Sequence, residues 1–324
     1  MRRVVSKLVW LGVFVVLSLL VVWRAQDITD VMMARGFVAS AEMEELIAEL
    51  DLTDRGLRIM NATRPQKGEG EWFNQNCTRH EVEMNVLGCF RAGRIFVFNV
   101  ENEDLTGINT VTLAHEFLHA VYGRMSARER ERIDRLVIEV FEEVRTEELD
   151  RRMEYYERTN LAAFYNELHS IIGTEVRDLP RELEEHYARF FRDRGRIVEI
   201  YEAYAGRLRE VAARSRELVR ELDELVDEIN AKVAIYNAER RSLNGKIGEF
   251  NRRAREGDFE DAAAMNRERD VLYAEQRRLQ GMLAEIEERT ARHEEVAREL
   301  REIALHIEAL NRSIDSTAGG VPEV

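Results

Sequence analysis

The segment AHEFLH, from Ala114 to His119, contains two histidines four residues apart, with a glutamate directly after the first. On an α-helix, residues i and i+4 lie on the same face one turn apart, so His115 and His119 can reach a single ion. Zinc binds neutral imidazole nitrogens at about 2.0–2.1 Å and, in catalytic sites, leaves one position for water. Glu116 would stand beside that water and accept its proton. The spacing therefore predicts one Zn²⁺ ion used for hydrolysis.

The neighbouring segments supply the elements that must position this motif. It lies in an amphipathic helical stretch, where Leu113, Phe117 and Val121 can face a core. The segment GRIFVFNV just before it alternates as a strand does, and GLRIMNAT further upstream also predicts a strand. SAEMEELIAEL predicts a short helix capped by Ser40. We therefore expect a small β-sheet beside the metal-binding helix.

Two segments, AHEFLHAVYGRMS and FYNELHSIIGTE, resemble the gluzincin branch of the zincin metallopeptidases, over roughly residues 55–200. In that branch the third metal ligand is a glutamate on a later helix, often within Asn-Glu-x-x-Ser/Ala, and NELHS matches this pattern. The resemblance implies His115, His119 and Glu167 as ligands and Glu116 as the general base. Zincin sites also place an edge strand across the active-site helix, where a peptide substrate can add as a further strand.

The chain also departs from the family pattern and leaves roles open. Ile171 stands where some gluzincins carry an aspartate four residues after the third ligand, and the extra Gly and His of the metzincins are missing. Glu175, eight residues after Glu167, is close to the same helical face and is a rival third ligand. His169 is either a transition-state donor or a satisfied structural histidine. Candidates for the oxyanion donor, by location only, are Tyr155, Tyr156 and Tyr165.

The N-terminal segment predicts a membrane anchor. Three basic residues precede an uncharged run from Leu8 to Trp23, which approaches the roughly 20 residues needed to span a bilayer. Positive charge before the run predicts a cytoplasmic N-terminus. A cleaved signal peptide is the alternative, although VVWRAQ lacks a small-x-small cleavage site. We therefore expect a single-pass cell-membrane protein with residues 8–23 in the lipid bilayer and an extracytoplasmic body.

The chain has two cysteines, Cys77 and Cys89. In an oxidising compartment two such thiols pair, and the closed loop would contribute on the order of 3 kcal/mol by the chain-entropy account. Cys-x11-Cys with no further cysteine is not a usual zinc spacing. We therefore predict a disulfide.

The composition indicates an α+β chain that is mostly helical. Charged residues make up 34% and aromatic residues 8% of its 324 residues, a profile typical of long helices with solvated faces. The net charge of −14 argues against nucleic acid as a partner, because with so many carboxylates we expect no positively charged face that could bind phosphates.

Two heptad series follow one another in the C-terminal part, from Leu222 to Phe250 and from Leu272 to Ile307, with Gly257 between them. They predict an antiparallel coiled-coil hairpin, and a parallel dimer of one helix is the alternative. The hairpin is also a candidate surface for a protein partner or for self-association. The predicted domains are a transmembrane signal anchor (1–24), a zincin-like metallopeptidase domain with a small sheet (25–204), the hairpin (205–312) and a disordered tail (313–324).

Together these features predict a membrane-anchored, extracytoplasmic zinc metallopeptidase that hydrolyses peptide bonds in a peptide or protein substrate. A non-enzymatic cell-envelope scaffold that binds a partner through the hairpin is the alternative, and a zinc amidase acting on cell-wall peptides is a lesser one. The enzyme is favoured because His115, Glu116 and His119 are all intact.

Overall fold

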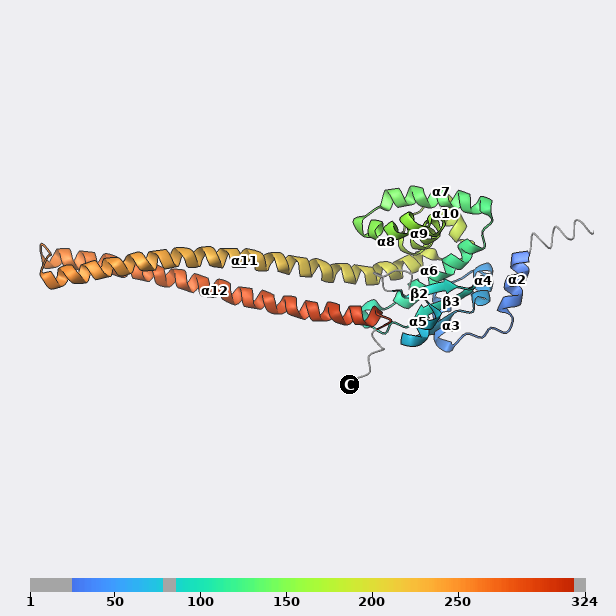
Figure 1. Cartoon of the computed structure of the whole chain (residues 1–324), viewed down its shortest axis with the longest axis horizontal. Coiled ribbons are helices and arrows are strands. Elements are labelled where there is room, and N and C mark those ends of the chain that lie inside the picture. The colour runs from blue at the N-terminus through green and yellow to red at the C-terminus, as the bar shows by residue number, and fades with distance from the viewer. Residues whose placement is uncertain (1–24, 78–85, 318–324) are drawn as a thin grey trace, which may run out of the picture. The chain divides into compact units, whose positions relative to one another are not determined.

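The computed structural model of the chain describes residues 25–77 and 86–317 (Figure 1). These residues are mostly helical and include a three-stranded sheet, as the composition and patterning predict. The chain divides into two units, which we call unit 1 (Met1–Arg207 with Leu310–Val324) and unit 2 (Leu208–Ala309). The predicted metal-binding helix and sheet belong to unit 1, and both heptad series lie almost wholly in unit 2.

Within the ranges that the structure describes, no helix is both long and apolar enough to cross a membrane. The predicted transmembrane anchor (1–24), with its bilayer segment 8–23, lies outside the described residues. The expectation of a single-pass membrane protein is contradicted by this finding.

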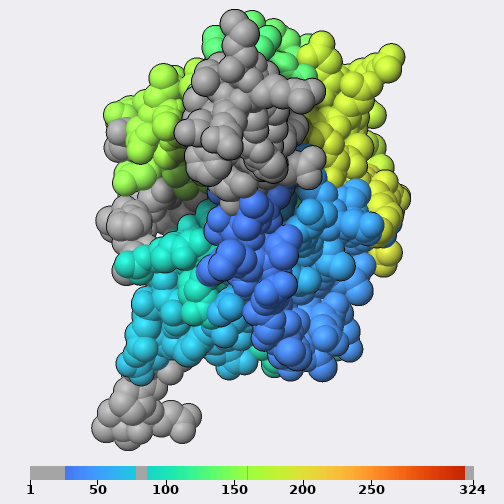
Figure 2. Space-filling view, turned by 90° about the vertical axis from the view of Figure 1, so that its right-hand side faces the viewer, coloured from blue at the N-terminus to red at the C-terminus, as the bar shows by residue number. Residues whose placement is uncertain are grey.

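Unit 1 contains short helices around a small sheet, and its N-terminal helices lie together on the face shown in Figure 2. In chain order its helices are α2 (Ala25–Ala34), α3 (Ala41–Glu49), α4 (Asp54–Thr63), α5 (Gly70–Asn76), the 3-10 helix η1 (Glu103–Leu105), α6 (Ile108–Gly123), α7 (Ala127–Val144), α8 (Glu147–Thr159), α9 (Leu161–Glu175), α10 (Arg181–Tyr187) and the first part of α11 (Arg194–Glu256). The predicted cap of α3 is confirmed, because the Ser40 side chain accepts a hydrogen bond from the backbone N–H of Met43.

The segment GLRIMNAT, predicted to be a strand, lies in α4 instead. The Thr53 hydroxyl accepts a hydrogen bond from the backbone N–H of Gly56 and so begins the helix. Ile59, Met60 and Thr63 are buried, and a spacing of one and four residues belongs to a helical face, whereas a strand would bury alternate residues.

The sheet has the strand order β1-β3-β2, with β1 (Gln66–Gly68) parallel and β2 (Gly88–Arg91) antiparallel to β3 (Arg94–Phe98). The predicted strand β3 is therefore central, and it is almost completely buried. A two-residue turn joins β2 to β3, with φ of 50° at Ala92 and 78° at Gly93, as the type I′ turn of a hairpin requires. Among the described strands, β2 lies at an edge of the sheet.

Helix α6 lies between the sheet and α9 and is the best-packed element of unit 1. Leu113, Phe117 and Val121 are all buried, so the predicted apolar face is confirmed. A glycine allows the close approach of α9, because a Cβ at Gly173 would lie 2.4 Å from Cδ1 of Leu118 and 2.8 Å from Cε1 of Tyr187. This packing fixes the distance between the two helices that carry the predicted ligands.

In unit 2 the remainder of α11 pairs with α12 (Ala262–Ile314) in antiparallel orientation (Figure 1). Leu218, Leu225 and Val296 form an apolar cluster between the two helices. Ion pairs then link the helices in opposite residue order, from Arg214–Glu299 through Arg292–Glu221, Arg289–Glu228, Lys232–Glu285, Arg278–Glu239 and Lys246–Glu275 to Arg253–Glu268 beside the turn. Gly257, with φ of 73°, lies in that turn. The pairing is within one chain, so the heptads need no second copy here.

The segment after α12 belongs to unit 1, and the structure describes it up to Thr317. Ser316 is buried, and its hydroxyl donates to the side-chain oxygen of Asn74 at 2.9 Å. Residues 313–317 are therefore not the predicted disordered tail, because hydrogen bonds to α5 and to Asn102 hold them. Residues 318–324 of the predicted tail lie outside the described residues.

Candidate metal centre

Helix α6 presents the two predicted histidines to an open cavity of about 430 Å³. One ligand atom from each of His115, Glu116 and His119 lies within 4.8 Å of the others. The two imidazole rings are perpendicular, with their centroids 4.7 Å apart. The helix therefore brings both histidines to one place, as expected of residues i and i+4 on one helical face.

Glu167, on α9, faces both imidazoles. Its Oε1 lies 3.3 Å from Nε2 of His115, and its Oε2 lies 3.4 Å from Nε2 of His119. Burial alone would raise the pKa of this carboxyl, but the imidazoles and the Arg152 guanidinium lower the pKa of Glu167 to about 2. The carboxylate is thus charged and directed at the two nitrogens that face the cavity.

The donor set fits a zinc ion. Two imidazole nitrogens and one carboxylate oxygen are ligands that catalytic zinc takes, with a fourth position for water. Ligand atoms about 2.0–2.1 Å from a tetrahedral ion lie about 3.3 Å from one another. Each histidine nitrogen has one oxygen of Glu167 near that separation, Oε1 at 3.3 Å from His115 and Oε2 at 3.4 Å from His119.

Ser170 fixes the orientation of the second imidazole from behind. Its hydroxyl lies 3.2 Å from Nδ1 of His119 and donates to the backbone oxygen of Asn166, also at 3.2 Å. When the hydroxyl donates to that carbonyl, its oxygen can accept from an Nδ1–H of the imidazole. In that neutral tautomer the other nitrogen of His119, Nε2, has a lone pair for a metal.

Glu116 lies against the edge strand and is buried, with 6% of its surface exposed. Burial, with the nearby charge of Glu167, raises the pKa of Glu116 to about 7, while His119 and a hydrogen bond from the backbone N–H of Phe90 oppose the shift. A Cβ at Gly88 would lie 2.8 Å from Cγ of Glu116 and 2.7 Å from Cγ2 of Thr112. Only glycine therefore lets β2 approach the helix this closely. In the sequence, the one sign of this close approach was a glycine within a strand.

Glu175, the rival third ligand, makes different contacts. Its two carboxylate oxygens accept hydrogen bonds from both terminal nitrogens of Arg152, at 2.7 and 2.8 Å, and Tyr201 also hydrogen-bonds to it. Burial would lower the pKa of Arg152, but Glu175 raises it above the ordinary value. The structure thus brings Glu167 to the histidines and assigns Glu175 to an arginine.

The lining of the cavity contains groups that the sequence did not single out. Among the described residues that line it, Arg152 is the only lysine or arginine, and Tyr204 and Asn166 are further polar groups. Of the three tyrosines suggested as oxyanion donors, Tyr156 lines the cavity and the other two do not. No sequence signal connects Arg152 to Glu175, because the two residues are 23 positions apart and lie on different helices.

His169 does not face the cavity, so its suggested role as a transition-state donor is corrected. The ring is completely buried, and its Nε2 lies 3.0 Å from Nε2 of His186. Burial lowers the pKa of His169 well below its usual value and lowers that of His186 to about 4. The Tyr187 hydroxyl donates to the backbone oxygen of His169. This histidine is part of the core between α9 and α10.

Comparison of the chain with known protein families, with curated proteins and with solved structures finds no match. The resemblance to gluzincins therefore stays a prediction from the sequence. Function has to be argued from the geometry of the residues around the cavity.

Proposed function

We propose that this chain is a zinc-dependent peptidase of the gluzincin type, with His115, His119 and Glu167 as ligands of one Zn²⁺ ion. The observation that supports the proposal most is the contact of one carboxylate with both imidazoles, at 3.3 and 3.4 Å. The hydroxyl of Ser170 adds to this support, because it can accept from Nδ1–H of His119 and so favours the tautomer whose Nε2 has a lone pair.

Glu116 is the proposed general base. A bound zinc ion would supply a Lewis acid that polarises the scissile carbonyl and makes a water more acidic. Glu116 accepts the proton of the attacking water and passes it to the leaving amine. The hydrogen bond from Phe90 and the close contact with Gly88 support this role, because they hold the carboxylate at the cavity wall.

The proposed substrate is an extended peptide. The cavity is lined on one side by residues 86–90, which include the start of β2, and on the other by α6 and α9. Among the described strands β2 pairs with β3 alone, so backbone groups on its other side, apart from the Phe90 N–H that bonds to Glu116, can bind a peptide as a further strand. A peptide bound there would lie alongside the carboxylate of Glu116.

The proposal is tested by the metal content of the purified full chain, measured by elemental mass spectrometry without added metal. Two matched variants, Glu167→Gln and Glu175→Gln, each remove one negative charge at nearly constant volume. We expect close to one zinc per chain in the wild type, a large loss in Glu167→Gln, and wild-type content in Glu175→Gln.

Two results would contradict the proposal. Zinc retained in Glu167→Gln and lost in Glu175→Gln would make Glu175 the third ligand. No bound metal in the wild type, even after zinc is offered, would instead favour the non-enzymatic scaffold. If the metal is present but protein substrates are not cleaved, release of cell-wall peptides is the assay that separates an amidase from a peptidase.

A further inference from the structure

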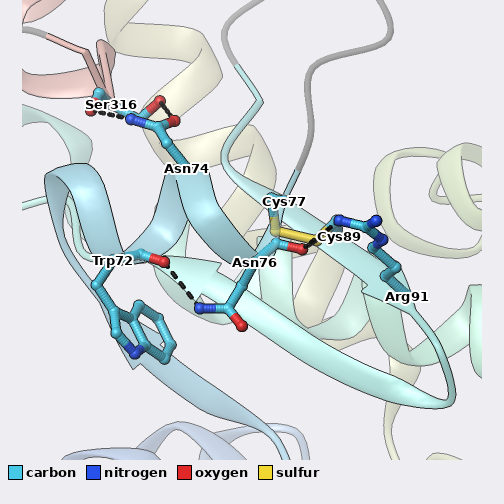
Figure 3. The surroundings of a disulfide bond; sticks show 7 residues. All are labelled: Trp72, Asn74, Asn76, Cys77, Cys89, Arg91 and Ser316. Carbon is cyan, nitrogen blue, oxygen red and sulfur yellow. Dashed lines mark hydrogen bonds between the residues drawn. A yellow bond between two sulfur atoms is a disulfide. The ribbon is translucent and has the colours of Figure 1, made fainter.

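The disulfide between Cys77 and Cys89 joins a helix to the edge strand at the proposed centre (Figure 3). Cys77 directly follows α5 and is buried, with 2% of its surface exposed. Cys89 is the second residue of β2 and lines the cavity. The predicted disulfide is therefore present, and it lies beside the cavity.

Both neighbours of Cys89 contact the proposed catalytic helix. On one side, Gly88 approaches Glu116 so closely that a Cβ would meet its Cγ at 2.8 Å. On the other side, the backbone N–H of Phe90 donates to the Glu116 carboxylate. The disulfide thus acts on the residue between the two contacts that position Glu116.

The other end of the disulfide is attached to a well-anchored helix. Phe73 of α5 packs on Phe98 of β3 with ring centroids 5.5 Å apart. Asn74 makes two hydrogen bonds with Ser316 (Figure 3). The Asn74 amide nitrogen donates to the Ser316 backbone oxygen at 2.8 Å, and the Ser316 hydroxyl donates to the Asn74 side-chain oxygen at 2.9 Å. Helix α5 is therefore fixed to the central strand and to the segment that follows α12.

The two ends of β2 are held in different ways. The turn at Ala92 and Gly93 fixes its C-terminal end to β3. Its N-terminal end is held by the pairing of Gly88 and Cys89 with β3, by the hydrogen bond from the N–H of Phe98 to the oxygen of Leu87 at 2.7 Å, and by the disulfide. The disulfide is the covalent restraint at this end of a strand of four residues, and edge strands open more readily than central ones. Opening the disulfide would therefore loosen the end of the strand that contacts Glu116.

We infer that the Cys77–Cys89 disulfide is a positioning element of the proposed centre, which holds β2 against Glu116 and is not needed for metal binding. This inference rests on the proposed function. Reduction by a dithiol breaks the sulfur–sulfur bond, converts both cysteines to thiols with two electrons and two protons, and leaves the reductant as a disulfide. The structure assigns three consequences to this step: faster opening of β2, slower turnover and unchanged zinc content.

The test compares the full-length wild type with the double variant Cys77→Ala/Cys89→Ala, in which no thiol is left to bind metal. Hydrogen–deuterium exchange of residues 87–91 reports the hydrogen bond from Phe90. We expect exchange there to rise by roughly tenfold or more, the factor that corresponds to one hydrogen bond to a charged group. Exchange in α6 should stay unchanged, as should the zinc content.

Turnover is the second readout. Displacement of a catalytic group by about 1 Å costs up to roughly a hundredfold, so we expect kcat to fall by about ten- to a hundredfold in the double variant. The same two cysteine changes in a Glu116→Gln background should lower kcat much less, because the group that they displace is already removed. A general structural defect would lower turnover by the same factor in both backgrounds.

Three outcomes would overturn the inference: unchanged exchange in residues 87–91, faster exchange without loss of turnover, or loss of zinc together with faster exchange in α6. If the double variant fails to fold, wild-type protein opened with a phosphine and then reoxidised provides the same comparison, and exchange must return to its first value. If no form cleaves peptides, the proposed function fails, and the exchange data alone decide whether the disulfide holds β2.

Discussion

The Ser170 hydroxyl lies 3.2 Å from Nδ1 of His119, on the opposite side of the imidazole from Glu167. Hydrogen bonds of this kind fix the tautomer of a metal-binding histidine, and their loss typically costs about 10- to 100-fold in metal affinity. We therefore expect Ser170→Ala to bind zinc about 10- to 100-fold more weakly than the wild type. Competition with a chelating dye measures this.

The matched control for that variant is Thr174→Val, one turn further along α9. The Thr174 hydroxyl is buried and donates to the backbone oxygen of Ser170 at 2.8 Å. It belongs to the same helix, yet its hydrogen bonds go to backbone oxygens rather than to an imidazole. An equal loss of zinc affinity in both variants would mean that a disturbed helix, and not the lost hydrogen bond to His119, is the cause.

Replacement of the proposed base should separate catalysis from metal binding. Glu116→Gln keeps the shape of the side chain but removes its ability to accept a proton, and general-base catalysis contributes about 10²- to 10⁴-fold. We expect kcat on an unfolded protein substrate to fall by that factor while the zinc content stays at the wild-type level. Cleavage by Glu116→Gln at the wild-type rate would remove Glu116 from the mechanism.

The packing of α6 on α9 should depend on a single glycine. An alanine at position 173 would place its Cβ 2.4 Å from Leu118 and 2.8 Å from Tyr187. Overpacking of this kind costs about 1–3 kcal/mol, and it would also move Glu167 away from the histidines. We expect Gly173→Ala to lower both the free energy of unfolding and the zinc affinity.

Gly123→Ala is the control, because a Cβ there meets no atom within 4 Å. Alanine is favoured over glycine in a helix by about 0.5–1 kcal/mol, so this variant should be as stable as the wild type or slightly more so. Tryptophan fluorescence in a urea titration measures the change in unit 1, since Trp72, the one tryptophan among the described residues, lies in α5. Equal effects at the two positions would contradict the packing argument.

The parts of the centre that the sequence predicts are those set by local geometry. His115 and His119 share a face because of the helical repeat, and the hairpin follows from heptads that repeat over many turns. The choice between Glu167 and Glu175 depended on long-range packing, since both lie on one face of α9. In the structure Arg152, from another helix, pairs with Glu175, while Glu167 faces the two histidines.

Two predictions made from local sequence were wrong because tertiary contacts determine the structure at those positions. GLRIMNAT has the residue types of a strand, but the Thr53 cap and the burial of Ile59 and Met60 belong to a helix. His169 was a candidate for the cavity because it is close in sequence to Glu167. Two residues turn an α-helix by about 200°, however, so the ring of His169 lies on the opposite side of α9. There it contacts His186, which no spacing rule connects to it.

The buried histidine pair gives the protein a predictable acid sensitivity. His186 is held by burial at a pKa of about 4, below its ordinary value of 6.5, and its ring contacts His169. The charged groups that act on it are Arg189, Glu129, Arg132 and Arg55. Between these two pKa values the unfolded chain binds a proton that the folded chain does not, so stability is complete above pH 6.5 and falls as the pH is lowered towards 4.

From the shift at His186 alone, we expect a loss of about 2 kcal/mol in the free energy of unfolding between roughly pH 7.5 and pH 5. His186→Gln cannot titrate but can still hydrogen-bond to His169, so it should lose that much less over the same interval. Urea unfolding followed by tryptophan fluorescence, with chelator present, measures both proteins under conditions where zinc binding makes no contribution. The substitution leaves every other histidine in place, so equal losses would mean that the buried pair is not the source of the acid sensitivity.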